Sequence, residues 1–104
     1  MFALVVRFDL IDEAAAEAFD ALAAAAAPAI RDSEPGTLVY AVHRVEDAPL
    51  SRIFYEVYSS REAHRQHEAH EPVARFLREK DQYLSGVHVD FLGSPTGKGL
   101  PSGG

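Results

Sequence analysis

The chain is 104 residues long and 47% hydrophobic, which is typical of a single globular domain. Its formal net charge is −6, with acids and bases interspersed, so no basic patch is available to bind nucleic acid or an anionic membrane. Cysteine is absent, which excludes disulfides, thiolate metal sites and a cysteine nucleophile. No apolar stretch is long enough to span a bilayer, and residues 1–7 lack the pattern of an export signal, so we expect a cytoplasmic protein.

The first elements predicted in chain order are a strand and a long helix. Residues 2–8 are rich in β-branched and aromatic types and apolar on both faces, as in the body of a sheet. From Asp12 onward the sequence is alanine-rich, and its larger apolar side chains recur at helical spacing. Pro28 costs roughly 3 kcal/mol inside a helix, so we expect a kink or an early end there. Residues 33–36 (SEPG) are typical of a turn.

Two further strands are predicted next, over residues 37–45 and 51–59. The five residues between them, 46–50, suit a hairpin, so the strands should pair antiparallel. Ser59 and Glu62 have the spacing of a capping box, which predicts the start of a second helix.

The last part of the chain predicts a broken helix, a strand and a tail. Pro72 disfavours helical backbone at the residue before it, so the second helix should break near residue 70 and a new one begin. Gly86 should end that helix, and residues 87–92 alternate as a final strand. We place the domain at residues 1–93 and expect 94–104, rich in glycine, proline and serine, to be a flexible tail.

This order, strand, helix, strand, strand, helix, strand, predicts an α+β fold with a four-stranded antiparallel sheet and helices on one face. The other face needs cover, and the sheet of a second copy is the simplest cover available. A domain this short buries only about 60 to 65% of the surface that its unfolded chain exposes, which also favours self-association. We therefore expect a homodimer.

Three histidines lie three residues apart on the second predicted helix: His64, His67 and His70. His64 and His70 would lie about 120° apart around the helix axis, so one metal ion could take two of them more easily than three. Because recognised zinc motifs need a further ligand, we expect no metal. The remaining alternatives are a solvated helix face, or one histidine, His67, that points into a pocket as a general base.

Glu56 lies in the middle of a strand whose neighbours are suited to burial, and a buried carboxylate is costly unless it is paired. One interpretation is a salt bridge to Arg7 or Arg44, or a contact with another subunit. The other is that Glu56 orients a pocket histidine or takes a proton itself. Alternation along the strand puts Glu56 on the same face as Phe54 and Tyr58, but does not say which face meets the helices.

Candidate substrate contacts are aromatic side chains that could line a pocket for a flat compound, with core or interface packing as the alternative. They are Tyr40, Phe54, Tyr58, His64 and Phe76. The sequence has no glycine-rich phosphate loop, no nucleophile elbow and no flavin or nicotinamide fingerprint, so we expect no cofactor.

Several short strings, in this order and spacing, resemble the antibiotic biosynthesis monooxygenase family. They are EPGTLVY at 34–40, YEVY at 55–58, a helix with Ala63 and His67, and VARFL at 73–77. The resemblance covers about residues 1–93. It implies a ferredoxin-like protomer, a dimer that joins two sheets into an α/β barrel, and a pocket between helices and sheet.

The resemblance also implies an activity. Members of the family include cofactor-independent oxygenases of quinols and anthrones, in which a base removes an acidic proton, the carbanion reduces O2, and the peroxide collapses to a quinone and water. The family's helix histidine carries over to His67 as the base, and its strand glutamate carries over to Glu56.

The sequence departs from the family pattern at two places. Many relatives follow the histidine with a Pro-His pair, whereas this chain has Glu71 and Pro72, so we expect His70 to assist His67 instead. Haem-degrading relatives use asparagine and tryptophan, which this chain lacks, and oxygenases that rely on the same residues are also poor models. Because one fold supports several reactions, a non-oxidative isomerase or polyketide cyclase and a non-catalytic ligand-binding dimer stay open as alternatives.

Overall fold

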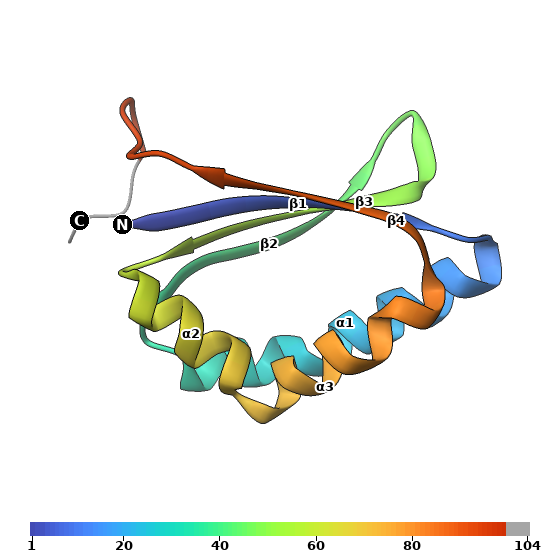
Figure 1. The fold of residues 1–104 in the computed structure, drawn as a ribbon, viewed down its shortest axis with the longest axis horizontal. Helices are drawn as coiled ribbons and strands as arrows, with labels where there is room; N and C mark the ends of the chain where they lie inside the picture. The colour runs from blue at the N-terminus through green and yellow to red at the C-terminus, as the bar shows by residue number, and fades with distance from the viewer. Residues whose placement is uncertain (100–104) are drawn as a thin grey trace.

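The structure is a computed structural model that describes residues 1–99. Its elements are, in chain order, β1 (Phe2–Leu10), α1 (Glu13–Ser33), β2 (Thr37–Val45), β3 (Ala48–Tyr58), α2 (Arg61–Ala69), α3 (Glu71–Glu79), a short 3-10 helix η1 (Lys80–Tyr83) and β4 (Leu84–Leu92). The strands form one antiparallel sheet in the order β2-β3-β1-β4. All the helices lie on one face of this sheet (Figure 1). The predicted α+β, ferredoxin-like fold is confirmed.

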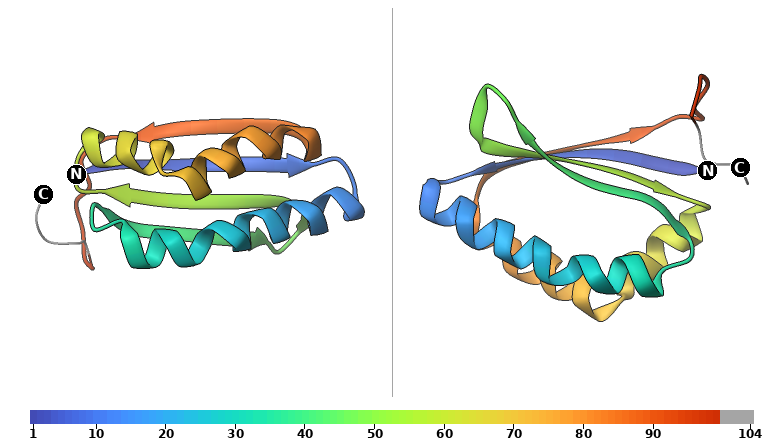
Figure 2. Two further views of the ribbon diagram at one scale, coloured as in Figure 1. Left: turned by 90° about the horizontal axis from the view of Figure 1, so that it is seen from below. Right: turned by 180° about the vertical axis from the view of Figure 1, so that it is seen from behind.

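The helices divide the covered face between them (Figure 2). α1 lies across the β2 and β3 side and α3 lies toward the β1 and β4 side, while α2 runs obliquely and contacts β2 and β3. Four phenylalanines pack together between the sheet and the helices, with ring centroids 4.9 to 6.2 Å apart. They are Phe8 and Phe54 from the two central strands, Phe19 from α1 and Phe76 from α3. This aromatic core packs α1 and α3 against the two central strands.

Of the two outcomes expected at Pro28, a kink or an early end, the early end is wrong, because α1 continues to Ser33. Pro28 is exposed, so water can satisfy the carbonyl group that loses its backbone partner. Ala26 and Ile30, on either side of it, are buried against Val73 of α3 and hold this end of the helix in place.

The cap of α2 also differs from the expectation. Ser60, and not Ser59, is the N-cap, and its hydroxyl accepts a hydrogen bond from the Ala63 backbone N–H at 3.1 Å. Ser59 instead bonds the turn before β2, because its N–H donates to the Gly36 carbonyl. Glu62 pairs with Arg65 on the exposed face of the helix, so no capping box forms.

Two strands, β3 and β4, begin earlier in the chain than predicted. β3 begins at Ala48, so the hairpin turn contains only residues 46–47. Gly86 does not end a helix: α3 ends through η1, and Gly86 lies inside β4 opposite Asp9.

Residues 93–99 form no helix or strand, and 100–104 of the predicted flexible tail lie outside the described residues. Within residues 1–99, no helix is long and apolar enough to cross a membrane.

Candidate functional site

A cavity of about 310 Å³ lies between the helix layer and the sheet. Its walls are mostly apolar side chains of β1, β4 and α3, and its polar lining comes from Glu56, His64, His67, Glu68 and Lys80. Of the predicted substrate contacts, Tyr40, Phe54, His64 and Phe76 line this cavity. Tyr58 does not line it but lies fully buried beside it, and His70 faces a different hollow on the outside of the fold.

Glu56 faces the helix layer, which strand alternation alone could not decide. It shares this face with Phe54 and Tyr58, and its neighbours across the sheet are Leu4 and Tyr40. Neither Arg7 nor Arg44 forms the salt bridge with Glu56 that was one interpretation of the sequence. Arg7 lies on the opposite face, where it bonds Asp9 and Ser51, and Arg44 bonds Asp20 of α1.

The environment of Glu56 favours its neutral form. The residue is 7% exposed, and burial raises the pKa of its carboxyl group above the ordinary 4.5. The Tyr58 hydroxyl, which donates to Glu56 Oε1 at 2.5 Å, and the nearby His67 act in the opposite direction without cancelling the effect. A carboxyl group held in this way can give or take a proton closer to neutral pH than a solvated one.

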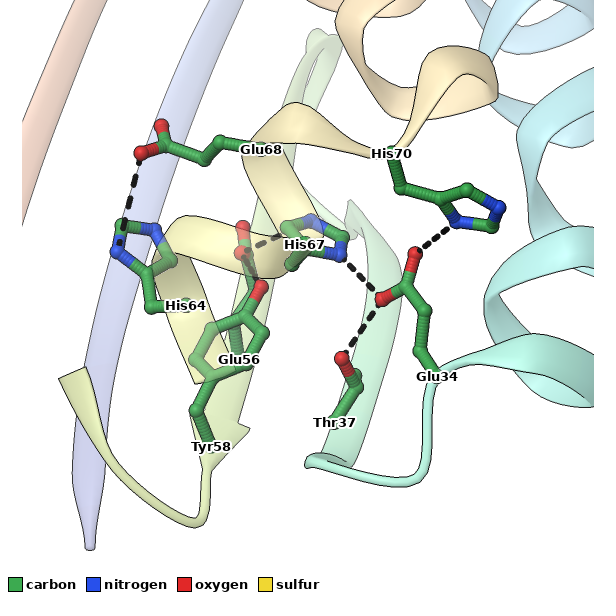
Figure 3. Close-up of polar contacts among 8 residues, drawn as sticks. All are labelled: Glu34, Thr37, Glu56, Tyr58, His64, His67, Glu68 and His70. Atoms are coloured by element: carbon green, nitrogen blue, oxygen red, sulfur yellow. Dashed lines mark hydrogen bonds and ion pairs between the residues drawn. The ribbon is translucent and has the colours of Figure 1, made fainter. Parts of the chain in front are cut away.

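His67 points inward from α2 because Ala63 and His67, one helical turn apart, form the buried face of that helix. Its ring is 4% exposed and packs against the rings of Tyr40 and Tyr58 at 5.2 and 5.1 Å. Nε2 faces the cavity, 3.9 Å from Glu56 Oε1, which is too long for a hydrogen bond. Nδ1 lies 2.6 Å from Oε1 of Glu34 (Figure 3).

Glu34 is the functional residue that sequence reasoning missed. The sequence places it in a turn and in the family string at 34–40 but assigns its side chain no role, yet that side chain is 7% exposed and contacts three polar partners. Oε1 lies 2.6 Å from Nδ1 of His67 and accepts from the Thr37 hydroxyl at 2.7 Å, while Oε2 lies 2.7 Å from Nδ1 of His70. Burial alone would raise the pKa of Glu34, but the hydrogen bonds from His70, His67 and Thr37 outweigh it and hold the pKa below its ordinary value.

The turn after α1 brings Glu34 to this position. Glu34 is the C-cap of the helix, and its carbonyl accepts the Thr37 backbone N–H at 3.1 Å. Gly36 lies against α2: a Cβ added to it would be 2.7 Å from the Cβ of Ala63. Glycine therefore permits the close approach of turn and helix through which Glu34 reaches His67.

His70 reaches Glu34 because the helix breaks at that residue, as predicted. His70 ends α2 and caps α3, with extended backbone (φ −66°, ψ 124°), and Pro72 follows in the first turn of α3. The backbone change turns the His70 side chain toward the outer side of Glu34, where 30% of it is exposed. His67 and His70 thus bind the two oxygens of one carboxylate (Figure 3).

His64 lines the cavity one turn before His67. Its ring packs between Phe2 and Tyr58, with centroid distances of 5.1 and 4.9 Å, and 15% of its side chain is exposed. Burial lowers the pKa of His64 below 6.5, although Glu68 at 3.9 Å partly opposes this. His64 therefore contributes a neutral imidazole to the wall of the cavity at pH 7.

The arrangement is suited to proton transfer inside an apolar cavity. It combines an imidazole nitrogen without a hydrogen-bond partner, a carboxyl group of raised pKa beside it, and a carboxylate behind the imidazole. Within residues 1–99, no group of three or more histidine, aspartate or glutamate side chains is arranged to hold a metal ion.

One family model matches the chain, and solved structures match its fold. The model of the family described as antibiotic biosynthesis monooxygenase matches residues 1–79. Rv0793 from Mycobacterium tuberculosis superposes with a TM-score of 0.83 at 23% identity, covering 94% of this chain and 98% of that one. No functionally curated protein matches the chain.

Two further solved structures, named as candidate antibiotic biosynthesis monooxygenases, have the same fold. The protein from Nitrosomonas europaea has a TM-score of 0.80 at 19% identity, covering 90% of this chain and 98% of that one. The protein from Caulobacter crescentus has a TM-score of 0.82 at 20% identity, covering 91% and 90%. At these identities the likeness shows a common fold.

Proposed function

The chain belongs to the antibiotic biosynthesis monooxygenase family, and on that premise we propose that it is a cofactor-independent monooxygenase of a small aromatic, quinol-like or anthrone-like compound. The observation that carries this proposal is the free Nε2 of His67, which faces an aromatic-lined cavity 3.9 Å from the buried carboxyl group of Glu56. The cavity of about 310 Å³ suits a compound of a few fused rings.

The proposed reaction begins with a proton transfer. Nε2 of His67 takes the acidic proton of the substrate, and the imidazolium that forms is stabilised by the Glu34 carboxylate 2.6 Å from its other nitrogen. The substrate carbanion transfers electrons to O2 and combines with it to form a peroxide. Collapse of that peroxide at a CH2 carbon expels water and leaves a carbonyl, so one CH2 and one O2 give one C=O and one H2O.

Glu56 supports the later steps of this scheme. Because burial raises its pKa, Glu56 can present a protonated carboxyl to an oxygen of the substrate or of the peroxide. The Tyr58 hydroxyl, which already donates to Glu56 Oε1, fixes the orientation of that carboxyl.

Oxygen uptake tests this function. Purified protein, with a chelator and no added cofactor, is given a panel of anthrones and hydroquinones in an oxygen electrode, and quinone formation is followed by absorbance. We expect one O2 per carbonyl formed with at least one anthrone, strong loss of uptake in His67→Gln, and normal uptake in the matched surface variant Arg65→Gln. Absence of uptake with the whole panel, or full uptake in His67→Gln, would overturn the proposal.

A non-oxidative isomerase or cyclase is the second candidate, favoured by the pairing of Glu56 with His67. A base and a carboxyl group of raised pKa, 3.9 Å apart, can remove a proton at one atom and return it at another. Product formed under nitrogen at the same rate as in air would select this reaction over the oxygenase.

A homodimer is part of the same proposal. The sheet face opposite the helices has no helix over it (Figure 1), and strand alternation places Val5, Ile53 and Tyr55 on this face. The sheet of a second copy would remove these side chains from water. Sedimentation should give the mass of a dimer for the wild type and of a monomer for Tyr55→Glu; a monomeric wild type at micromolar concentration would refute the proposal.

A further inference from the structure

We propose that Glu34 is a positioning residue for His67: it fixes the imidazole in the tautomer with hydrogen on Nδ1, so that the unprotonated Nε2 faces the cavity. This inference deepens the proposed function, because it rests on that function for the use of His67 as a base. The tautomer itself, however, is a property of the resting protein and can be measured without a substrate.

The hydrogen-bond partners of Glu34 determine where the hydrogen of His67 lies. An ionised carboxylate accepts hydrogen bonds and donates none, so each of its partners must supply a hydrogen. Both oxygens of Glu34 are engaged, Oε1 by the Thr37 hydroxyl and by Nδ1 of His67, and Oε2 by Nδ1 of His70. The lowered pKa of Glu34 keeps the carboxylate ionised at neutral pH. The hydrogen of neutral His67 is therefore on Nδ1.

The other nitrogen of His67 is free as a consequence. The carboxyl oxygen that faces it, Oε1 of Glu56, is 3.9 Å away, beyond hydrogen-bond distance. A neutral imidazole with its hydrogen on Nδ1 has its lone pair on Nε2, directed into the cavity. With the opposite tautomer, the lone pair of Nδ1 would face the Glu34 carboxylate at 2.6 Å, and two acceptors would repel each other.

The charge around Glu34 also suits a base. In the described part of the chain, Glu34 forms ion-pair contacts with His67 and His70 alone, and no lysine or arginine lies within that distance of it. Its negative charge is therefore not neutralised in advance by a permanent cation. When His67 takes a proton at Nε2, the positive charge forms beside a carboxylate that is already in place.

His70 and Thr37 act on Glu34 and not on the cavity. His70 lies on the outer side, in a hollow of about 340 Å³ that Glu34 and His67 also line. It covers the second oxygen of Glu34, while Thr37 holds the first. His70 therefore assists His67 indirectly: it orients Glu34, and Glu34 orients His67.

Nitrogen NMR of the full-length, 15N-labelled protein tests the inference. Long-range 1H–15N correlations distinguish the two neutral tautomers, and the His67 signals are identified by their loss in His67→Gln. At a pH where titration shows His67 to be uncharged, we expect the Nδ1–H form in the wild type and in Glu34→Gln, whose amide oxygen still accepts. In Glu34→Ala we expect a shift of His67 toward the Nε2–H form.

Glu62→Gln is the matched control, because Glu62 is an exposed glutamate of α2 that pairs with Arg65 and touches neither histidine nor cavity. It should leave the His67 signals unchanged. An Nε2–H tautomer in the wild type, or the same Nδ1–H tautomer in folded Glu34→Ala, would overturn the inference. If Glu34→Ala does not fold, the wild-type tautomer decides. Lack of oxygen uptake would refute the proposed function and leave this result standing.

Discussion

His67 and Glu56 approach each other from different layers of the fold, with Nε2 of the histidine on α2 3.9 Å from Oε1 of the glutamate on β3. The gap is too wide for a direct hydrogen bond and leaves both groups available to a third molecule in the cavity. Each also has a second polar contact: Nδ1 of His67 lies 2.6 Å from Oε1 of Glu34, and Oε1 of Glu56 accepts a hydrogen bond from the Tyr58 hydroxyl at 2.5 Å. The Glu34 and Tyr58 contacts both have measurable consequences.

Replacement of Glu56 should change the pH dependence of stability. The folded pKa of Glu56 lies above the ordinary 4.5, so between these two values the folded state binds more protons than the unfolded state. This group therefore removes stability as pH rises from 4.5 through its folded pKa. We expect Glu56→Gln to gain stability relative to the wild type over that range, as measured by thermal unfolding at a series of pH values. A difference that does not vary with pH would contradict the raised pKa.

Replacement of Glu34 should have the opposite sign. Its folded pKa lies below 4.5, so its stabilising contribution is present above 4.5 and is lost as pH falls through the folded value. Glu34→Gln should therefore be less stable than the wild type near neutral pH, with the difference shrinking in acid. The same unfolding series measures it. Equal slopes for Glu34→Gln and Glu56→Gln would refute this assignment of the two carboxyl groups.

Tyr58→Phe should weaken the support of Glu56. The variant keeps the ring but removes the hydroxyl that donates to Glu56 Oε1, which leaves a buried acceptor without its partner. Losses of this kind are about 1–3 kcal/mol. Denaturant unfolding measures the free energy, and the loss should be smaller when Glu56 is already leucine. A Tyr58→Phe effect of the same size in the Glu56→Leu background would show that the two residues are not coupled.

Gly36→Ala should separate the turn from α2. The added Cβ would be 2.7 Å from the Cβ of Ala63, so one of the two segments must move, at a cost of about 1–3 kcal/mol. Because that contact positions Glu34 beside His67, the variant should also disturb the His67 NMR signals. Ala63→Gly removes the opposing atom, so the double variant should be more stable than the sum of the single effects predicts. Simple additivity would show that no clash occurs.

The order of strands and helices could be predicted because it depends on local patterns. Alternation and helical spacing are properties of neighbouring residues, and the helix break near residue 70 follows from Pro72. The early helix end predicted at Pro28 is wrong because the energetic cost of a proline in a helix depends on its exposure and on the packing of the flanking turns. The local sequence contains neither.

The site could be predicted only in part, for the same reason. His67 and Glu56 stood out as a helix histidine and a strand carboxylate, but the face on which Glu56 lies needed the register of the whole sheet. Glu34 is 33 residues from His67 and 36 from His70 in the chain, so no periodicity connects them. A glutamate directly before Pro-Gly is readily explained as part of a turn, so nothing in the sequence indicated that its side chain would contact the two histidines.

The most direct test of the claim that His67 is the base of this cavity is proton abstraction without oxygen. Anthrone deuterated at its methylene carbon is incubated under nitrogen, and loss of deuterium to water is followed by NMR for the wild type, His67→Gln and Arg65→Gln. We predict wild-type and Arg65→Gln exchange above the buffer rate, with about 10²- to 10⁴-fold of that acceleration lost in His67→Gln. Wild-type exchange at the buffer rate, or undiminished exchange in His67→Gln, would contradict the claim.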